Sequence, residues 1–320
     1  MIHLFNGFQD SFGGSERKTV ELYRLLGAET GARLWAASSR ASQEWTRQFP
    51  IHRISPLTRH VPDGGTYVFI GAHWRNKIWP YLIPRPRRLI YDFSTFHPKV
   101  MGLTTHMPAT LGWPEAELVL VSDFQKRMLR ADGVVHPSPI DIGRFSARPA
   151  RPDGPFTIGR MSRDTPDKHH DDDIALYEAL LAEGVAVKIQ GGVQLKDRLA
   201  PHPGLELLPV GQLAAEDFLP TLDVFYYRTG SHVETFGRVV FEAMACGLPV
   251  VCHSNGGYVD HISHGENGFL FETTQGAARI LADLKADPGL RATVGRKARQ
   301  TVEQLFSTQA LQKRLDFYRR

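Results

Sequence analysis

The chain has 320 residues, of which 42% are hydrophobic and 22% are charged. These values exclude a disordered or fibrous protein and suit two globular domains, at about 150 residues each. The net charge of +4 is mildly basic, but Lys and Arg are scattered and not interleaved with aromatic residues. A nucleic-acid groove needs that interleaving, so no nucleic-acid partner is expected.

The sequence contains no apolar run near the ~18 residues that a membrane span needs. The N-terminus "MIHLFNGFQDSFGGSE" also lacks a basic region followed by a long apolar one. Cys246 and Cys252, the two cysteines, fit a reducing compartment better than a disulfide framework. We therefore expect a cytoplasmic protein. Peripheral contact with the inner membrane surface stays open, because the basic charge also suits an anionic membrane.

Short apolar runs alternate with stretches of helical periodicity along the first half. The expected strands are 1–5, 32–38, 66–72, 87–93 and 116–122, and the expected helices are 15–31 and 123–133. The second of these helices is expected to begin at an N-cap, Asp123, and to close at Gly133. Strands separated by helices predict βαβ units and a parallel sheet.

The Pro- and Arg-rich run "RPARPDGP" (148–155) is the best linker candidate. A second series follows it, with expected strands at 156–162, 185–192, 223–229 and 249–254 and helices at 173–184 and 307–320. The fold class is therefore predicted as α/β, with two doubly wound, Rossmann-like parallel-sheet domains and a cleft between them. The predicted domains are residues 1–147 and 148–306. The helix 307–320 follows, and packing against the N-terminal domain is one option for it.

Two glutamates bracket a predicted helix start in "HVETFGRVVFEAMACGLPVV" (232–251). The helix is expected to begin around Thr235 to Gly237 and to end at Gly247. Its free N–H groups at the carboxyl end of a strand suit an anion, and Gly237 permits close backbone approach. A carboxylate can accept hydrogen bonds from both hydroxyls of a sugar diol. Glu234 and Glu242, with an anion between them, therefore predict a nucleotide-sugar pocket.

A simpler interpretation is that Glu234 caps the helix and that Glu242 is a solvated helix residue. The apolar surroundings of Glu242, between "VVF" and "AMACG", argue against it, because an unpaired buried carboxylate is costly.

The pattern "E-x-F-G-x-x-x-x-E-A-M-A-C-G-x-P-V-V", followed by "GG" and "G-E-N-G-F-L", spans residues 232–271. It resembles the donor-domain signature of the retaining glycosyltransferase family 4 (glycosyl transferases group 1), which has GT-B architecture. The resemblance implies that Glu242 binds the nucleotide ribose and that Glu234 lies near the donor hexose as a catalytic residue. It assigns donor hydroxyls or phosphate to the backbone of three residues, Thr235, Phe236 and Gly237.

Other segments carry the resemblance more weakly. "GRMSRDTPDK" (159–168) is similar to a Gly-Arg…Lys loop that grips the diphosphate, which implies catalytic roles for Arg160 and Lys168. The longer spacing makes Arg163 an alternative. "GGSE" (13–16) resembles a glycine turn facing the diphosphate, and this implies donor contacts at Gly13 and Gly14. The similarity is thin over 32–115, and "VHPSPIDIGRF" (135–145) departs from the family pattern at Ser138 and Pro139.

On the acceptor side, the resemblance points to residues after strand ends of the N-terminal domain, and His73, Asp92 and His97 are the candidates. The run "HHDDD" (169–173) suggests a metal site. It lies directly before a helix, however, so acids that satisfy free N–H groups are the favoured explanation. Neither a metal nor another cofactor is expected.

Taken together, these features imply an enzyme that moves a sugar from a UDP- or GDP-sugar to an acceptor hydroxyl, with retention of configuration. The acceptor is a glycan, a lipid or a small molecule, and cations at a strand end would stabilise the leaving diphosphate. One alternative is a non-catalytic nucleotide- or sugar-binding protein. Another is a different two-domain α/β nucleotide-dependent enzyme. A dinucleotide oxidoreductase needs Gly-x-Gly-x-x-Gly, and "NGFQDSFGGSE" does not supply it.

Overall fold

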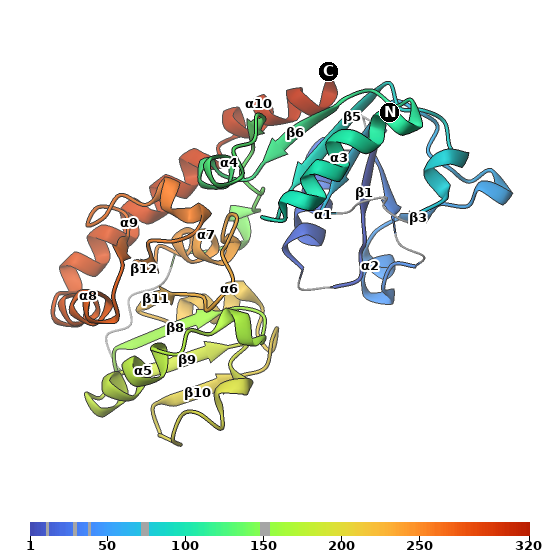
Figure 1. Ribbon diagram of the computed structural model, residues 1–320. Helices are drawn as coiled ribbons and strands as arrows, with labels where there is room; N and C mark the ends of the chain where they lie inside the picture. Colours follow the sequence, from blue (N-terminus) through green and yellow to red (C-terminus); the bar gives the residue numbers. More distant parts are fainter. Residues whose placement is uncertain (11–12, 28–30, 38–39, 72–76, 148–153) are drawn as a thin grey trace. The chain divides into compact units, whose positions relative to one another are not determined.

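The computed structural model describes residues 1–10, 13–27, 31–37, 40–71, 77–147 and 154–320. The chain divides into two compact units. Unit 1 comprises Met1–Ile140 together with Thr308–Arg320, and unit 2 comprises Asp141–Ser307. Each unit is built on a parallel sheet with helices packed against it (Figure 1). The predicted α/β fold class with two doubly wound domains is thus confirmed.

Unit 1 holds a seven-stranded sheet in the order β3-β2-β1-β4-β5-β6-β7. Its strands are β1 (Ile2–Asn6), β2 (Arg33–Ala36), β3 (Ile51–Arg53), β4 (Thr66–Ile70), β5 (Arg88–Phe93), β6 (Ala116–Leu120) and β7 (Val134–Val135). Its helices are α1 (Gly14–Leu26), α2 (Gln43–Gln48), α3 (Pro98–Leu111), α4 (Asp123–Leu129) and α10 (Thr308–Arg319). The central strands are buried on both faces, which explains their nearly continuous apolar sequences.

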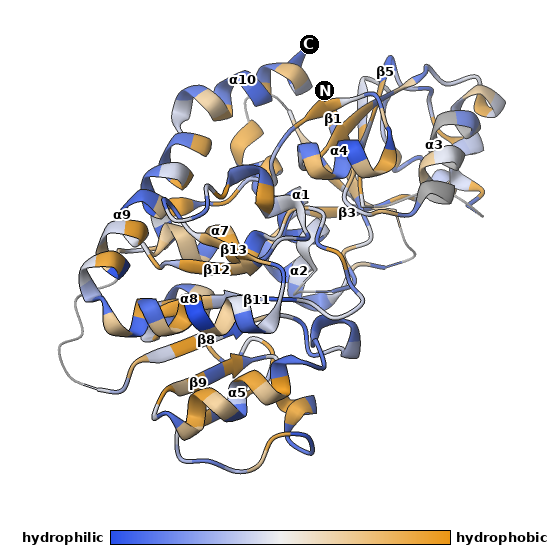
Figure 2. Ribbon diagram, turned by 60° about the vertical axis from the view of Figure 1, so that its left-hand side comes forward, coloured by the Kyte–Doolittle hydropathy of each residue, from blue (hydrophilic) through white to orange (hydrophobic). Residues whose placement is uncertain are grey.

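Unit 2 holds a six-stranded sheet in the order β10-β9-β8-β11-β12-β13. Its strands are β8 (Thr157–Met161), β9 (Ala186–Gln190), β10 (Leu205–Leu208), β11 (Val224–Tyr227), β12 (Val250–His253) and β13 (Phe269–Phe271). Its helices are α5 (Asp173–Ala182), α6 (Ala215–Phe218), α7 (Arg238–Ala245), α8 (Thr274–Ala286) and α9 (Pro288–Leu305). In Figure 2, β12 is mostly orange, as expected for a strand covered on both faces.

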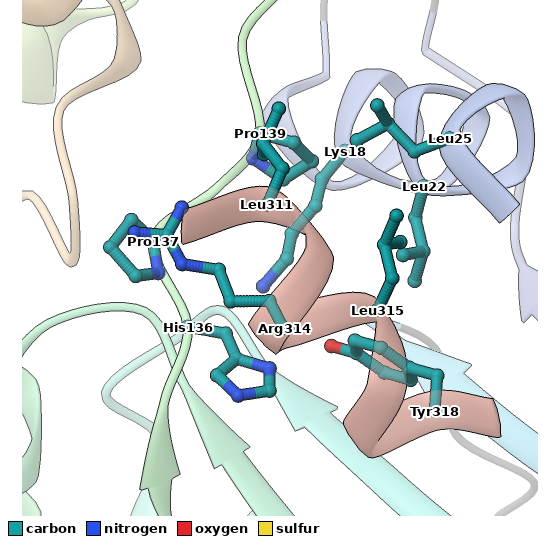
Figure 3. A pocket seen from close by; sticks show the side chains of 10 residues that line it. All are labelled: Lys18, Leu22, Leu25, His136, Pro137, Pro139, Leu311, Arg314, Leu315 and Tyr318. Atoms are coloured by element: carbon teal, nitrogen blue, oxygen red, sulfur yellow. The ribbon is translucent and has the colours of Figure 1, made fainter. Parts of the chain in front are cut away.

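The last helix, α10, completes the core of unit 1. Its residues Leu315, Phe317 and Tyr318 are buried in one apolar cluster with residues of β1 and α1. Figure 3 shows Lys18 of α1 and Tyr318 of α10 around one small cavity of ≈ 20 Å³. That volume is about the room of one water molecule, so the two helices are closely packed.

Local details differ from the sequence predictions. Ser122, and not Asp123, caps α4, because its side chain accepts from the backbone N–H of Gln125. The helix ends at Leu129, four residues before Gly133, where the sequence predicts its end. Arg130 follows it in the left-handed conformation. The periodicity also missed several short elements, among them β3, α2, β7 and β10, which are too brief to show a repeat.

Residues 148–153 of the predicted linker lie outside the described residues. Within the described part of the chain, no helix is long and apolar enough to cross a membrane.

Candidate functional site

The sheet order of unit 2 reverses between β8 and β11. The strands β8, β9 and β10 run outward on one side, and β11, β12 and β13 run outward on the other. The loops that leave the carboxyl ends of β8 and β11 diverge at such a point and leave a crevice, where doubly wound proteins bind ligands. The predicted site residues 160–168 and 234–242 follow these two strands, so the topology places both groups at this end of the sheet.

A lysine–glutamate pair joins the two loops. Lys168, at the end of a short 3-10 turn after β8, places its Nζ 2.5 Å from Glu234 Oε1. The hydroxyl of Tyr227, the last residue of β11, donates to the same oxygen at 2.7 Å. The Lys168 side chain is 7% exposed and that of Glu234 is 16% exposed. The structure thus brings together two predicted residues that are 66 positions apart in the sequence.

A histidine connects Glu234 with the other loop. His232 Nε2 lies 3.7 Å from Glu234 Oε2, and its Nδ1 lies 3.4 Å from Asp167 Oδ2. The backbone N–H of His232 also donates to the carbonyl of Asp167 at 3.1 Å. Asp167, His232, Glu234 and Lys168 therefore form a row of alternating charge when the imidazole is protonated, and both loops contribute to it.

The surroundings of this row lower the pKa values of Glu234 and Lys168. Burial disfavours the carboxylate form of Glu234, but the contacts with His232 and Lys168 outweigh it, so its pKa lies well below the ordinary value. For Lys168, burial is the largest influence and lowers the pKa, the nearby Arg163 lowers it further, and Glu234 opposes both. Glu234 is hence held as a carboxylate that accepts hydrogen bonds.

Arg160 lies beneath this pair and not on the surface. Its side chain is 1% exposed, and its guanidinium donates to the backbone carbonyls of Arg228, at 2.5 Å, and Lys168, at 2.6 Å. It also lies over the Tyr227 ring. The guanidinium thereby ties the two loops to each other and holds Lys168 in place. The diphosphate contact that the sequence assigned to Arg160 stays a prediction, and this geometry favours a positioning role.

The helix start follows Glu234 directly. Gly237 precedes α7 with φ of 84°, in the left-handed region that favours glycine. A Cβ atom there would lie 2.6 Å from Tyr258 Cδ1, so the position is restricted by both conformation and space. Phe236 is buried and stacks on Phe241 with ring centroids 4.3 Å apart. The backbone of Thr235, Phe236 and Gly237 is therefore held in one conformation at the helix start.

Glu242 lies inside α7 and is 3% exposed. Its Oε1 lies 3.7 Å from a guanidinium nitrogen of Arg238, one turn earlier on the helix. The alternative of a solvated helix residue is excluded, because the carboxyl is buried. A Schellman motif closes the helix: Gly247, with φ of 69°, donates to the carbonyl of Met244, and Leu248 donates to that of Ala243.

The second glycine turn belongs to the same region. The backbone N–H of Gly257 donates to the carbonyl of Glu234 at 2.8 Å, and Gly256 forms a parallel bridge with Glu234. The turn after β12 thus supports the backbone of the loop that carries the glutamate.

An open cavity of ≈ 670 Å³ adjoins the two loops. Its lining includes Pro166, Asp167, His169, Gly230 and Ser231 from the loops after β8 and β11. The exposed Arg163 belongs to the same loop after β8. Among the described residues, neither Lys168 nor Glu234 belongs to its lining.

The acids before α5 act differently from the prediction. Asp172 stands at the N-cap without a side-chain capping bond, so satisfaction of the helix N–H groups does not explain it. Asp171 pairs with Arg198 at 2.8 Å, and the buried Asp173 accepts from Arg228 and Tyr226. Within the residues that the structure describes, no three His, Cys, Asp or Glu side chains are grouped as metal ligands.

The candidates of unit 1 are spread over the unit. Gly13 is the N-cap of α1 and Gly14 is its first residue, at the carboxyl end of β1. Asp92 is fully buried in β5, where Lys18 and Tyr318 use its two oxygens. It is therefore part of the core of unit 1.

Two histidines complete the set of acceptor candidates. His97 is exposed at the N-cap of α3. His73 lies outside the described residues.

Three residues of the unit 2 site were not singled out from the sequence: Asp167, Tyr227 and His232. Each is adjacent to or within a quoted motif, since Asp167 precedes Lys168 and His232 precedes Glu234 by two positions. Asp, Tyr and His are residue types that binding sites use, so their types alone were compatible with a role in the site. Only the approach of the two loops shows that the three side chains converge on Glu234 and its neighbours.

Comparison with known protein families matches one part of the chain. Residues 210–301 match the model of the family described as Glycosyl transferases group 1. This stretch runs from before β11 into α9 and includes Glu234, Gly237 and Glu242.

Curated relatives align with similar parts of the chain. The chain is 28% identical over 178 residues to the capsular polysaccharide biosynthesis glycosyltransferase CapM of Staphylococcus aureus, covering 50% of this chain and 45% of CapM. It is 38% identical over 97 residues to the D-inositol 3-phosphate glycosyltransferase of Streptomyces avermitilis, covering 30% of this chain and 20% of that protein. The aligned stretches thus span less than half the length of these relatives.

Solved structures are similar over nearly the full length. The Anabaena protein HepE, crystallised with UDP and glucose, superimposes with a TM-score of 0.73 at 18% identity, over 99% of this chain and 98% of HepE. A glycosyltransferase from Rickettsia africae gives a TM-score of 0.74 at 18% identity, over 99% and 97% of the two chains. At this identity the likeness shows the fold, which is that of the GT-B glycosyltransferases.

Proposed function

We propose that this protein is a glycosyltransferase that takes a sugar from a nucleotide-diphosphate donor and transfers it to an acceptor hydroxyl with retention of configuration. The observation that carries the proposal is the Lys168–Glu234 pair, which joins two loops at the reversal point of the unit 2 sheet beside the helix start at Gly237. The match of residues 210–301 to glycosyl transferases group 1 supports the assignment.

The donor would bind with its diphosphate at the start of α7. The backbone N–H groups at the start of α7 and the positive end of the helix favour an anion there. Lys168 contacts Glu234, three residues before Gly237, and the exposed Arg163 lies on the same loop as Lys168. We assign the diphosphate to these groups. Arg160 is assigned a positioning role, because its buried guanidinium already serves the carbonyls of both loops.

The two glutamates would bind the sugars at either end of the diphosphate. Glu234, an ionised carboxylate beside the helix start, suits the hydroxyls of the transferred sugar. Glu242, buried further along α7, suits the diol of the nucleotide ribose. Each carboxylate replaces water around hydroxyl groups that would otherwise lose hydrogen bonds on burial.

In the reaction, the bond between the anomeric carbon and the diphosphate oxygen breaks, and the bonding electrons stay with the diphosphate. The acceptor hydroxyl oxygen forms the new bond on the same face of the sugar, and its proton passes to the departing phosphate oxygen. Lys168 and the α7 helix start would stabilise the negative charge that develops on the diphosphate. No residue of the chain is needed as a covalent nucleophile in this scheme.

The names of the relatives bear on the substrates. HepE was crystallised with UDP-glucose, which supports a UDP-sugar as the first donor to test, with GDP-sugars next. CapM is named for capsular polysaccharide biosynthesis, which supports a growing glycan as the acceptor, ahead of a lipid or a small molecule.

The test is the thermal stabilisation of the protein by UDP-, GDP- and ADP-sugars. A donor present at 100 times its Kd stabilises the folded state by about 2.7 kcal/mol, which gives a clear rise in Tm. The rise should be absent in Glu242→Ala and retained in Glu178→Ala, a matched control at an exposed glutamate of α5. Circular dichroism without ligand checks that both variants fold.

Hydrolysis and transfer of the stabilising donor then separate an enzyme from a binding protein. A donor that stabilises wild type but is neither hydrolysed nor transferred supports the non-catalytic alternative. If no nucleotide sugar raises the Tm of wild type above that of Glu242→Ala, the donor site is wrongly assigned.

A further inference from the structure

Residues 77–87, which precede β5, present several large apolar side chains to solvent. In residues 77–87, here named the apolar–basic loop, Ile78 is 75% exposed, Tyr81 is 64% exposed and Leu82 is 58% exposed. Single exposed apolar residues are common on protein surfaces. Three within five positions form a patch, and a patch of this kind marks an interaction surface.

The loop is held in this exposed arrangement by its own anchors. Trp79 stacks with Phe5, with ring centroids 5.8 Å apart and planes 7° apart, and also with Phe69 at 6.3 Å. Ile83 is buried in the same cluster. Because Trp79 and Ile83 lie on either side of the exposed Tyr81 and Leu82, these two side chains cannot turn inward without moving Trp79 or Ile83 away from the cluster.

Positive charge follows the apolar side chains. Arg85 and Arg87 are exposed and alternate with prolines, whereas Arg88 pairs with Glu117 of β6. The sequence from residue 64 to residue 91 contains no Asp or Glu. The charge of the loop is therefore not balanced by acidic residues of its own segment.

We propose that the apolar–basic loop docks this protein on an anionic lipid surface. Apolar side chains that enter the headgroup region, combined with arginines that face anionic headgroups, are the combination that holds proteins at a membrane interface. The arginine stems also extend along apolar surface while their charged ends stay hydrated. A symmetric contact between two copies of the loop would bring their exposed arginines together without an acidic residue of the loop to pair with them, so charge favours the lipid over a second copy. The inference does not depend on the proposed function.

The experiment is sedimentation of the full chain with vesicles. Phosphatidylcholine vesicles with and without phosphatidylglycerol are compared for wild type, for Ile78→Ser with Leu82→Ser, and for Arg85→Gln with Arg87→Gln. The matched control is Arg296→Gln with Lys297→Gln, which removes the same two charges from exposed positions of α9. All substituted residues are exposed and lie outside the hydrophobic core, so the melting temperature of each variant should stay close to that of wild type.

Wild type is expected to bind the phosphatidylglycerol vesicles and not those of phosphatidylcholine alone. The variant Arg85→Gln with Arg87→Gln should weaken vesicle binding roughly 30-fold, at about fivefold for each arginine. A higher salt concentration should also weaken the binding of wild type. The variant Ile78→Ser with Leu82→Ser should weaken vesicle binding roughly tenfold or more, because two apolar side chains no longer become buried in the lipid. The control pair should bind nearly as wild type does.

The proposal is overturned if wild type ignores phosphatidylglycerol, or if the control pair weakens binding as much as the arginine pair. It is also overturned if wild type forms dimers that the Ile78→Ser, Leu82→Ser variant abolishes, because the occupant of the loop is then a second copy. Loss of vesicle binding leaves nucleotide-sugar stabilisation unaffected, so the two proposals fail independently.

Discussion

Each unit places a lysine 2.5 Å from a carboxylate, but the two pairs lie in different surroundings. In unit 1, Lys18 pairs with Asp92, and their side chains are 3% and 0% exposed. In unit 2, Lys168 pairs with Glu234, and the glutamate is 16% exposed beside the loops that line an open cavity. The first pair is closed off by packing, and the carboxylate of the second pair is partly exposed.

The pKa shifts of the two carboxyls run in opposite directions. Burial raises the pKa of Asp92 above the ordinary value, and the opposing contacts with Lys18 and Tyr318 are too weak to cancel it. Burial has the same sign for Glu234, but the contacts with His232 and Lys168 outweigh it and lower the pKa. The Lys18–Asp92 pair is therefore a structural contact whose burial costs free energy. The Lys168–Glu234 pair instead holds an ionised carboxylate in a fixed position.

The largest effect is expected from Asp92→Asn, which tests whether the first pair is structural. The change leaves the Lys18 ammonium buried without a carboxylate, and we expect a loss of about 3–5 kcal/mol in the free energy of unfolding. Urea unfolding measures it. The double variant Lys18→Met with Asp92→Leu should recover much of the loss, because an apolar pair replaces the buried charges. A single variant as stable as wild type would refute the structural role.

Glu234→Gln tests the second pair. The turnover of the stabilising donor should fall on the order of 100-fold, because the neutral amide no longer holds Lys168 or the sugar hydroxyls as a carboxylate does. The stability loss should be smaller than that of Asp92→Asn, since the Glu234 side chain is 16% exposed and that of Asp92 is 0% exposed. Steady-state kinetics and urea unfolding of both variants make the comparison. If both variants lose the same stability and turnover is unchanged in Glu234→Gln, the Lys168–Glu234 pair is structural, as the Lys18–Asp92 pair is.

His136 extends the comparison to pH. Burial, with the charges of Lys18 and Arg314, lowers its pKa from 6.5 to about 4. Between these values the unfolded chain binds a proton at His136 and the folded chain does not. Stability should therefore fall as the pH falls through this window, by about 1.4 kcal/mol for each pH unit, and be constant below it.

His136→Leu should flatten this part of the stability–pH curve, measured by urea unfolding from pH 4 to pH 7. The matched control His106→Leu, at an exposed histidine of α3, should leave the slope as in wild type. An unchanged slope in His136→Leu would show that another group carries the pH dependence.

The smallest effect is expected from His232→Gln. Removal of the imidazole takes away one contact that lowers the pKa of Glu234, so the acid limb of the pH–rate profile should move to higher pH. The rate at neutral pH should fall by about fivefold at most, as for the loss of one partly exposed ion pair worth up to ~1 kcal/mol. The same profile for His170→Gln, a histidine beside Asp172, is the control. An acid limb that stays in place would show that His232 does not act on Glu234.

The sequence by itself determined the features that depend on neighbours along the chain. The helix after β11 begins and ends where the glycines predict, because Gly237 and Gly247 take left-handed conformations there. The βα alternation gave the two parallel sheets, since period and length separate strands from long helices. The spacing of Glu234 and Glu242 around one helix start followed from the same local reasoning.

Tertiary structure decided which charged side chains are accessible. Arg160 lies next to the last residue of β8, as a ligand-binding arginine would, but the carbonyl groups of Arg228 and Lys168 and the ring of Tyr227 enclose it. Tyr318 reaches Asp92 across 226 positions of sequence. Burial and charge pairing sum contacts from segments far apart in the chain, and the spacing of residues within one motif carries no information about those contacts.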